Sequence, residues 1–139
     1  MEETRLLIPF FGMLALTLLV WVFMYTRRIG FMLTNRIPAR AAYTPEKVAQ
    51  LLPDDVNAAA NNLRNLFELP VLFYAMCLYL VWAGQADQIH VASAWVFFMF
   101  RAVHSAVHCT INHVMTRFCV YIVSALALWT MVIRAALAL

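Results

Sequence analysis

The chain has 139 residues, of which 65% are hydrophobic and only 12% are charged, and its formal net charge is +3. A soluble domain is about 45–50% apolar and about 25% charged, so this chain has too little polar surface to cover a globule in water. The composition excludes a soluble enzyme, a disordered tail and a disulfide-stapled secreted module. It predicts an integral membrane protein, and the scattered basic residues predict no nucleic-acid partner.

The first apolar run covers residues 6–25. Its length of about 20 residues matches a hydrocarbon core about 30 Å thick. A signal peptide would start with a basic segment, whereas this chain places Glu2 and Glu3 before Arg5. We therefore expect a retained first membrane span.

Residues 26–61 form the only long polar segment, and we expect a cytoplasmic loop there. Two helix starts lie within it, at Thr44-Pro45-Glu46 and at Pro53-Asp54-Asp55. Proline and acidic residues are favoured in the first turn of a helix. The first start predicts a short interfacial helix near residues 45–52, and the second leads into the next span.

Three further spans are expected, at residues 62–83, 89–109 and 117–139, with Pro70 as a kink in the second span. The turn between the second and third spans is short, so these two spans form an antiparallel hairpin. Most basic residues lie in the two loops between spans, so the positive-inside rule places both loops in the cytoplasm and both termini outside. The predicted fold is a single all-α domain, a four-transmembrane-helix bundle over residues 1–139.

Two of the predicted spans carry polar faces, although one charged residue at a helix centre costs roughly 2.5–3.5 kcal/mol. The faces lie in the cytoplasmic halves of their helices, so we expect them to meet and Glu68 to pair with Arg101. Such a pocket is open to the cytoplasm and rich in donors, and it suits an anionic, polar ligand. Its predicted members are Asn61, Arg64, Asn65 and Glu68 on the second span and Arg101, His104, Ser105 and His108 on the third.

The same residues carry a resemblance to a known family. The string from Asn61 to Pro70 resembles the N-x-x-E-x-P signature of the membrane-associated proteins in eicosanoid and glutathione metabolism (MAPEG). The string from Arg101 to His108 is similar to the R-x-x-H-[ST]-x-x-Y motif of that family. Arg117 follows Arg101 by 16 residues, the spacing of the branch with microsomal glutathione transferase and prostaglandin E synthase.

The resemblance implies a homotrimer of four-helix subunits, with glutathione bound between neighbouring subunits near the cytoplasmic side. It implies that Asn65, Glu68, Arg101 and His104 hold the tripeptide, and that Arg117 stabilises its thiolate. A lipophilic cosubstrate would enter from the lipid. The implied activity is that of a glutathione transferase or peroxidase acting on a lipophilic electrophile or a lipid hydroperoxide.

Two positions depart from the family pattern, and the chain looks like a bacterial branch, which implies the inner membrane. Asn61 stands where the family commonly has Arg, and His108 stands where it has Tyr. Both departures favour an alternative, a non-catalytic membrane subunit or scaffold with the same fold. The spacing of His104 and His108, four residues apart, leaves a third alternative open, a small metal- or haem-binding membrane protein.

Overall fold

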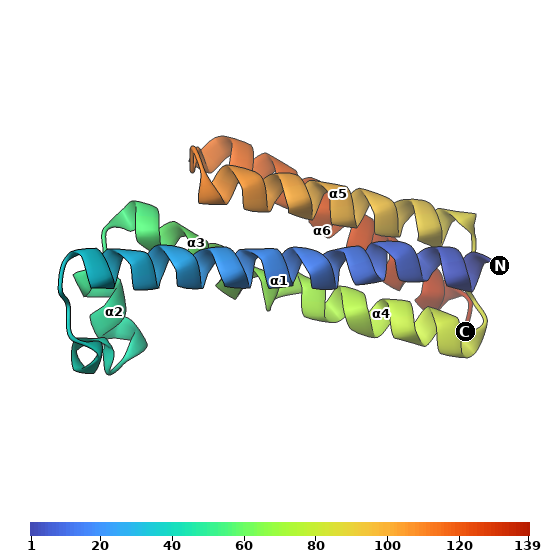
Figure 1. Cartoon of the computed structure of the whole chain (residues 1–139). Coiled ribbons are helices and arrows are strands. Elements are labelled where there is room, and N and C mark those ends of the chain that lie inside the picture. The colour runs from blue at the N-terminus through green and yellow to red at the C-terminus, as the bar shows by residue number, and fades with distance from the viewer.

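The computed structural model describes all 139 residues, and its regular elements are all helical. The long helices run along a common axis, with both termini at one end and the short helices at the other (Figure 1). In chain order the elements are α1 (Glu2–Thr34), the 3₁₀-helix η1 (Ala39–Ala42), α2 (Pro45–Leu51), α3 (Asp54–Leu66), α4 (Leu69–Ala83), α5 (Gln88–Cys109) and α6 (Val114–Leu137).

Helix α1 continues to Thr34, well past the end of the predicted first span at residue 25. Its 33 residues give a length of about 50 Å at 1.5 Å per residue. The apolar run marks the part of a helix that suits lipid, and nothing in the following residues breaks the helix. The last turns of α1 therefore extend beyond a hydrocarbon core of about 30 Å.

The polar segment at residues 26–61 is largely helical rather than a loop. Both expected helix starts are present: α2 begins at Pro45, with the Thr44 hydroxyl accepting the Lys47 backbone N–H at 3.3 Å, and α3 begins at Asp54. A small apolar cluster ties these helices to the end of α1. It consists of Val48, Leu52 and Val56, packed against Phe31, Met32 and Ala42.

The second predicted span is interrupted, and α3 ends at Leu66 before α4 begins at Leu69. Pro70 has no backbone N–H to donate to the Leu66 carbonyl, and its ring clashes with a helical carbonyl four residues back. The expected kink is thus a break of the helix. At the break the backbone N–H of Phe67 turns to the Arg64 carbonyl at 3.0 Å.

Short turns make α4 and α5, and then α5 and α6, antiparallel neighbours. Gly84 ends α4 in the left-handed conformation (φ 64°), which glycine adopts without steric cost. The Asp87 carboxylate begins α5 by accepting the His90 backbone N–H at 2.8 Å. The His113 ring begins α6 by accepting the Thr116 backbone N–H at 3.3 Å.

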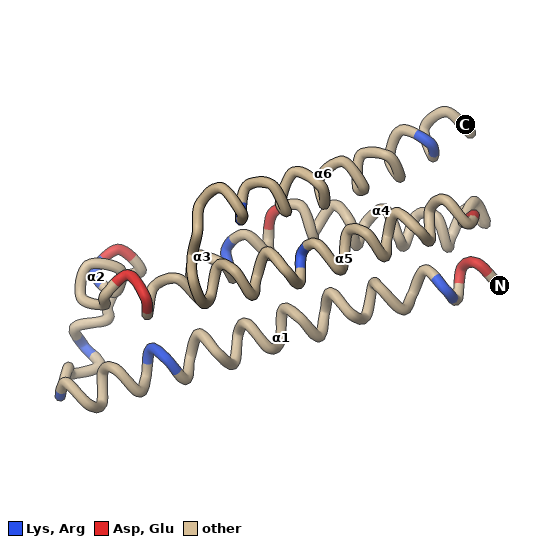
Figure 2. The backbone as a smooth tube through the Cα atoms, turned by 90° about the horizontal axis from the view of Figure 1, so that it is seen from above, with Lys and Arg blue, Asp and Glu red and all other residues tan.

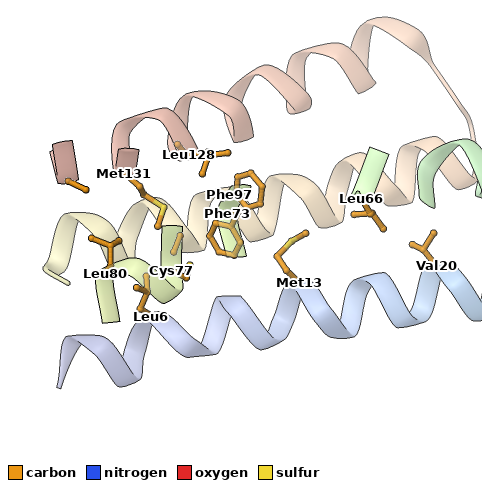
Figure 3. Packing of buried hydrophobic residues seen from close by; sticks show 13 residues of the cluster. Leu6, Met13, Val20, Leu66, Phe73, Cys77, Leu80, Phe97, Leu128 and Met131 are labelled. Carbon is orange, nitrogen blue, oxygen red and sulfur yellow. The ribbon is translucent and has the colours of Figure 1, made fainter. Parts of the chain in front are cut away.

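The apolar core lies between α1, α4, α5 and α6 and includes Leu66 at the end of α3 (Figure 3). At its centre the rings of Phe73 and Phe97 stack with centroids 4.4 Å apart. By length and composition α1, the α3–α4 unit (Asp54–Ala83) and α6 are apolar enough to cross a membrane. Helix α5 is not among them, because Arg101, His104 and His108 lower its mean hydropathy.

Candidate functional site

Arg101, on α5, is the largest fully buried side chain of the protein, with 0% of its surface exposed. Its Nη2 donates a hydrogen bond of 2.7 Å to the backbone carbonyl of Asn65. Its guanidinium carbon lies 5.5 Å from the centre of the Tyr121 ring on α6, within reach of a cation–π attraction. The remaining donors, Nε and Nη1, are buried without a partner.

The break between α3 and α4 supplies the acceptor for Arg101. In a continuous helix the Asn65 carbonyl would accept the Leu69 N–H, but α3 has ended before that residue. The carbonyl instead accepts the Glu68 backbone N–H at a long 3.4 Å, and it has a lone pair left for Arg101. Pro70 therefore helps to position the Arg101 guanidinium, because the helix break that it causes leaves the Asn65 carbonyl available as an acceptor.

His104 and His108 lie one turn apart on α5, both buried, with ring centroids 5.6 Å apart. Arg117 Nη1 approaches His108 Nε2 at 3.4 Å. Because a guanidinium only donates, Nε2 is the acceptor and the ring proton is on Nδ1. This Nδ1 is buried and unpartnered, as is that of His104.

Arg117 lies in the first turn of α6 and is half-buried. Its Nη1 donates a short bond of 2.6 Å to the Asn112 side-chain oxygen. Asn112 has a positive φ of 48°, which Asn tolerates better than most residues, and it turns the chain between α5 and α6. The α5–α6 turn therefore places Arg117 beside the histidines.

Asn62 is a buried member of the site that the sequence analysis missed. Its side-chain oxygen accepts the Ser105 hydroxyl at 3.3 Å, and its Nδ2 points to the Cys109 sulfur at 3.4 Å. The buried face of α3 also holds Ala58, Ala59 and Leu66. Ala58, Asn62 and Leu66 are each four residues apart, so they lie on one helical face. This spacing was the signal in the sequence from which the inner face could have been found.

A model of the MAPEG family matches residues 6–137, nearly the whole chain. The chain belongs to the MAPEG family. It is thus an integral membrane protein of the kind that serves glutathione and eicosanoid metabolism. Neither the curated proteins nor the solved structures contain a significant match.

The MAPEG motif on α5 is concentrated in one place, with Arg101, His104, Ser105 and His108 all buried. The motif residues of the second span are placed differently. Asn65 is half-buried and reaches Arg101 through its backbone carbonyl, while its side chain bonds to the Asn61 carbonyl at 3.3 Å. Asn61, Arg64 and Glu68 are exposed on the single chain.

The prediction that Glu68 forms an ion pair with Arg101 is wrong, since no carboxylate lies within 4 Å of the guanidinium. The prediction assumed one continuous helical face from Asn61 to Glu68. The helix ends at Leu66, so the residues after it leave that face and Glu68 turns to the surface. Arg101 is therefore a buried cation without a carboxylate partner.

Tyr121 is the second site residue that the sequence analysis missed. Its ring lies 5.9 Å from that of His104 and also contacts the Arg101 guanidinium. It follows Arg117 by four residues on α6, so the two share a helical face, and this spacing was the available signal. No three His, Cys, Asp or Glu side chains come together in a group that could hold a metal ion.

The arrangement is a cluster of donors around a buried positive charge. Arg101 offers two free donor nitrogens, Nε and Nη1, His108 offers one at Nδ1, and Arg117 adds a second guanidinium at the more exposed end. Arginine donors match the geometry of a carboxylate and remain charged at every physiological pH. The arrangement therefore has the donors and the charge that an anion requires.

Proposed function

We propose that this MAPEG protein is a glutathione-dependent transferase or peroxidase that acts on a lipophilic electrophile or a lipid hydroperoxide. The observation that carries the proposal is the buried, uncompensated guanidinium of Arg101 with two free donors. A buried charge without a partner is expensive to maintain, and an anionic ligand would supply the missing compensation. Glutathione, with two carboxylates and an ionisable thiol, has the required chemistry.

In this proposal Arg101 and His108 receive a carboxylate of glutathione, and Arg117 stabilises its thiolate. A nearby guanidinium lowers the pKa of a thiol, and the thiolate is the reactive form. In the transferase reaction the sulfur forms a C–S bond to the electrophile, and the electrons of the broken bond go to the leaving group or the addition product. In the peroxidase reaction two glutathione molecules give up their thiol hydrogens to the hydroperoxide, which yields an alcohol, water and a disulfide.

The proposal includes the assembly that the family implies. Helix α5 would be a fourth membrane span, with its polar face turned inward, and three subunits would bind glutathione between them. The exposed Asn61, Arg64 and Glu68 would then face a neighbouring subunit or the ligand rather than lipid. The loops would lie in the cytoplasm and the termini outside, in a bacterial inner membrane.

Calorimetric titration of glutathione into the detergent-purified protein tests the proposal. We expect micromolar to millimolar binding that is abolished in Arg101→Ala and retained in Arg5→Ala, which removes an arginine at the other end of the molecule. Circular dichroism of each variant checks that the fold is intact. Absence of binding to the folded wild type would overturn the proposal.

A second function, that of a non-catalytic membrane subunit, is favoured by the bonds of Arg117. Its Nη1 is already engaged by Asn112 and His108, which makes it less available to a thiolate. In that case the folded protein would bind no glutathione and would copurify with a partner protein in a stable ratio. Thiol-dependent turnover with a chloronitrobenzene electrophile would exclude this alternative.

A further inference from the structure

A second group of uncompensated cations lies at the end of the molecule opposite the termini. Lys and Arg residues gather around the far end of α1 and around α2 (Figure 2). Arg27 is neutralised by Asp55 at 2.6 Å, but four others form no salt bridge. We name these four the basic collar: Arg28, Arg36, Arg40 and Lys47.

Few acidic residues accompany the basic collar: Glu46 lies within it, and Asp54 and Asp55 follow at the start of α3, where Asp55 is paired with Arg27. Between residues 28 and 53 the only carboxylate is that of Glu46. Arg36, Arg40 and Lys47 are exposed, and Arg28 is half-buried. None of the four takes part in the donor cluster around Arg101, so the glutathione proposal leaves them unexplained.

The length of α1 places the basic collar at the edge of the bilayer. Residues 6–25 fill a hydrocarbon core of about 30 Å, so Arg28 and the last turns of α1 emerge at the level of the lipid headgroups. The packing of Val48, Leu52 and Val56 against α1 then holds α2 back beside those turns. The collar is therefore fixed next to the membrane surface.

Exposed apolar side chains accompany the collar. Tyr43 is 83% exposed, with the Lys47 ammonium 6.0 Å from its ring centre, and Leu33 is 74% exposed. Tyrosine is typical of the membrane–water interface, where its ring contacts lipid and its hydroxyl contacts water. A soluble polyanion would give these side chains no apolar contact, whereas a lipid surface does.

We propose that the basic collar binds the phosphate headgroups of anionic phospholipids and so selects them over zwitterionic ones around this end of the protein. Basic residues next to a membrane are attracted to anionic headgroups. The exposed Tyr43 and Leu33 enter the interfacial layer beside them. This inference stands independently of the glutathione proposal, because it uses none of the same residues.

Native mass spectrometry of the full chain with an equimolar mixture of phosphatidylglycerol and phosphatidylcholine tests the proposal. Each of the four basic residues near an anionic surface contributes about fivefold in affinity, so a preference for phosphatidylglycerol on the order of 600-fold is expected at low salt. The preference should decrease as salt screens the charges. The triple variant Arg36→Gln/Arg40→Gln/Lys47→Gln should bind the two lipids within about fivefold of each other.

Two controls make the test decisive. Arg5→Gln removes a basic residue at the opposite end and should keep the preference, and glutathione binding by the triple variant should equal that of the wild type. Equal binding of the two lipids by the wild type, or a preference that survives in the triple variant, would overturn the proposal. Displacement of phosphatidylglycerol by an equal concentration of inorganic phosphate would also overturn it, since the collar would then be a site for a soluble anion.

Discussion

At the end of the molecule that holds the termini, every charged side chain has a partner of opposite sign. Glu2 pairs with Arg5 at 3.1 Å, Glu3 pairs with the terminal amine, and Asp87 joins Arg134 of α6 to the start of α5. In the donor cluster at the other half of the molecule, Arg101 and Arg117 have no carboxylate within 4 Å. Both regions contain arginines, but the charges of the first region are neutralised within the chain, whereas the second keeps an uncompensated positive charge.

Under the proposed function, the difference separates charges that serve folding from charges that would serve binding. A paired charge is compensated within the chain and stabilises the ends of helices. A buried cation without a carboxylate partner costs folding free energy, and a bound anion would offset that cost. The two regions should therefore respond with opposite sign when their charges are removed.

The largest expected effect comes from Arg117→Ala. Removal of one preorganised donor that stabilises a developing charge lowers turnover about 100-fold. The ultraviolet absorbance of bound thiolate should fall together with the rate of conjugation to a chloronitrobenzene. Unchanged turnover in the folded variant would show that Arg117 has no part in the reaction.

Arg101→Met should stabilise the protein by up to about 1 kcal/mol while it abolishes glutathione binding. The variant removes a charge that costs roughly 2.5–3.5 kcal/mol in a membrane helix. It loses one hydrogen bond worth about 1–2 kcal/mol and the cation–π contact with Tyr121, worth about 1 kcal/mol. Thermal unfolding in mild detergent measures the change. Arg101→Lys keeps the charge and should show no gain, and a loss of stability in Arg101→Met would refute the distinction between the two regions.

Asp87→Ala should lower the stability by about 1 kcal/mol, because it removes the cap of α5 and the bond to Arg134. Glutathione binding should stay at the wild-type level, since the site lies in the other half of the molecule. Asp87→Asn keeps the capping oxygen and should fall between the alanine variant and the wild type. A loss of binding in Asp87→Ala would mean that the two regions are coupled.

The smallest expected effect is a dependence of the folding stability on pH, through the carboxylate of Asp87. Burial raises the pKa of Asp87, but the hydrogen bonds from the His90 backbone and from Arg134 outweigh it and hold the pKa below the usual 3.8. The charged form is thus favoured in the folded state, so its contribution is complete above pH 3.8 and is lost as the pH falls through the lowered value.

The carboxylate is 43% exposed, so solvent screening keeps this contribution under about 1 kcal/mol. The stability difference between the wild type and Asp87→Asn should therefore shrink as the pH falls below 3.8. Thermal unfolding at a series of pH values measures it. A difference that persists unchanged in acid would show that the charge of Asp87 does not contribute to the stability.

Local signals in the sequence were enough to predict much of the fold. Thr44 and Pro45 begin α2, Asp54 begins α3, and Pro70 interrupts the second span between α3 and α4. Each of these effects involves residues within one or two helical turns, so it can be read from neighbouring positions. The end of α1 could not be read in this way, because hydrophobicity reports the fit to lipid and not the length of the helix.

The candidate site was predictable only where its helix is continuous. On α5 the spacing of Arg101, His104 and His108 gave one buried face, as observed. On the second span the same reasoning failed at Glu68, because a break of two residues changes the direction of every later side chain. The inner face of α3 could have been found from the buried alanines Ala58 and Ala59, because Asn62 follows Ala58 by one helical turn.

The break between α3 and α4 also has an electrostatic consequence. It divides the apolar unit Asp54–Ala83 into two helices, each with its own macrodipole. The negative end of α3 meets the guanidinium of Arg101 through the Asn65 carbonyl. The positive end of α4, equivalent to about half an elementary charge, begins three residues later inside the same apolar unit. A single proline thus places two opposite helix poles within one apolar segment.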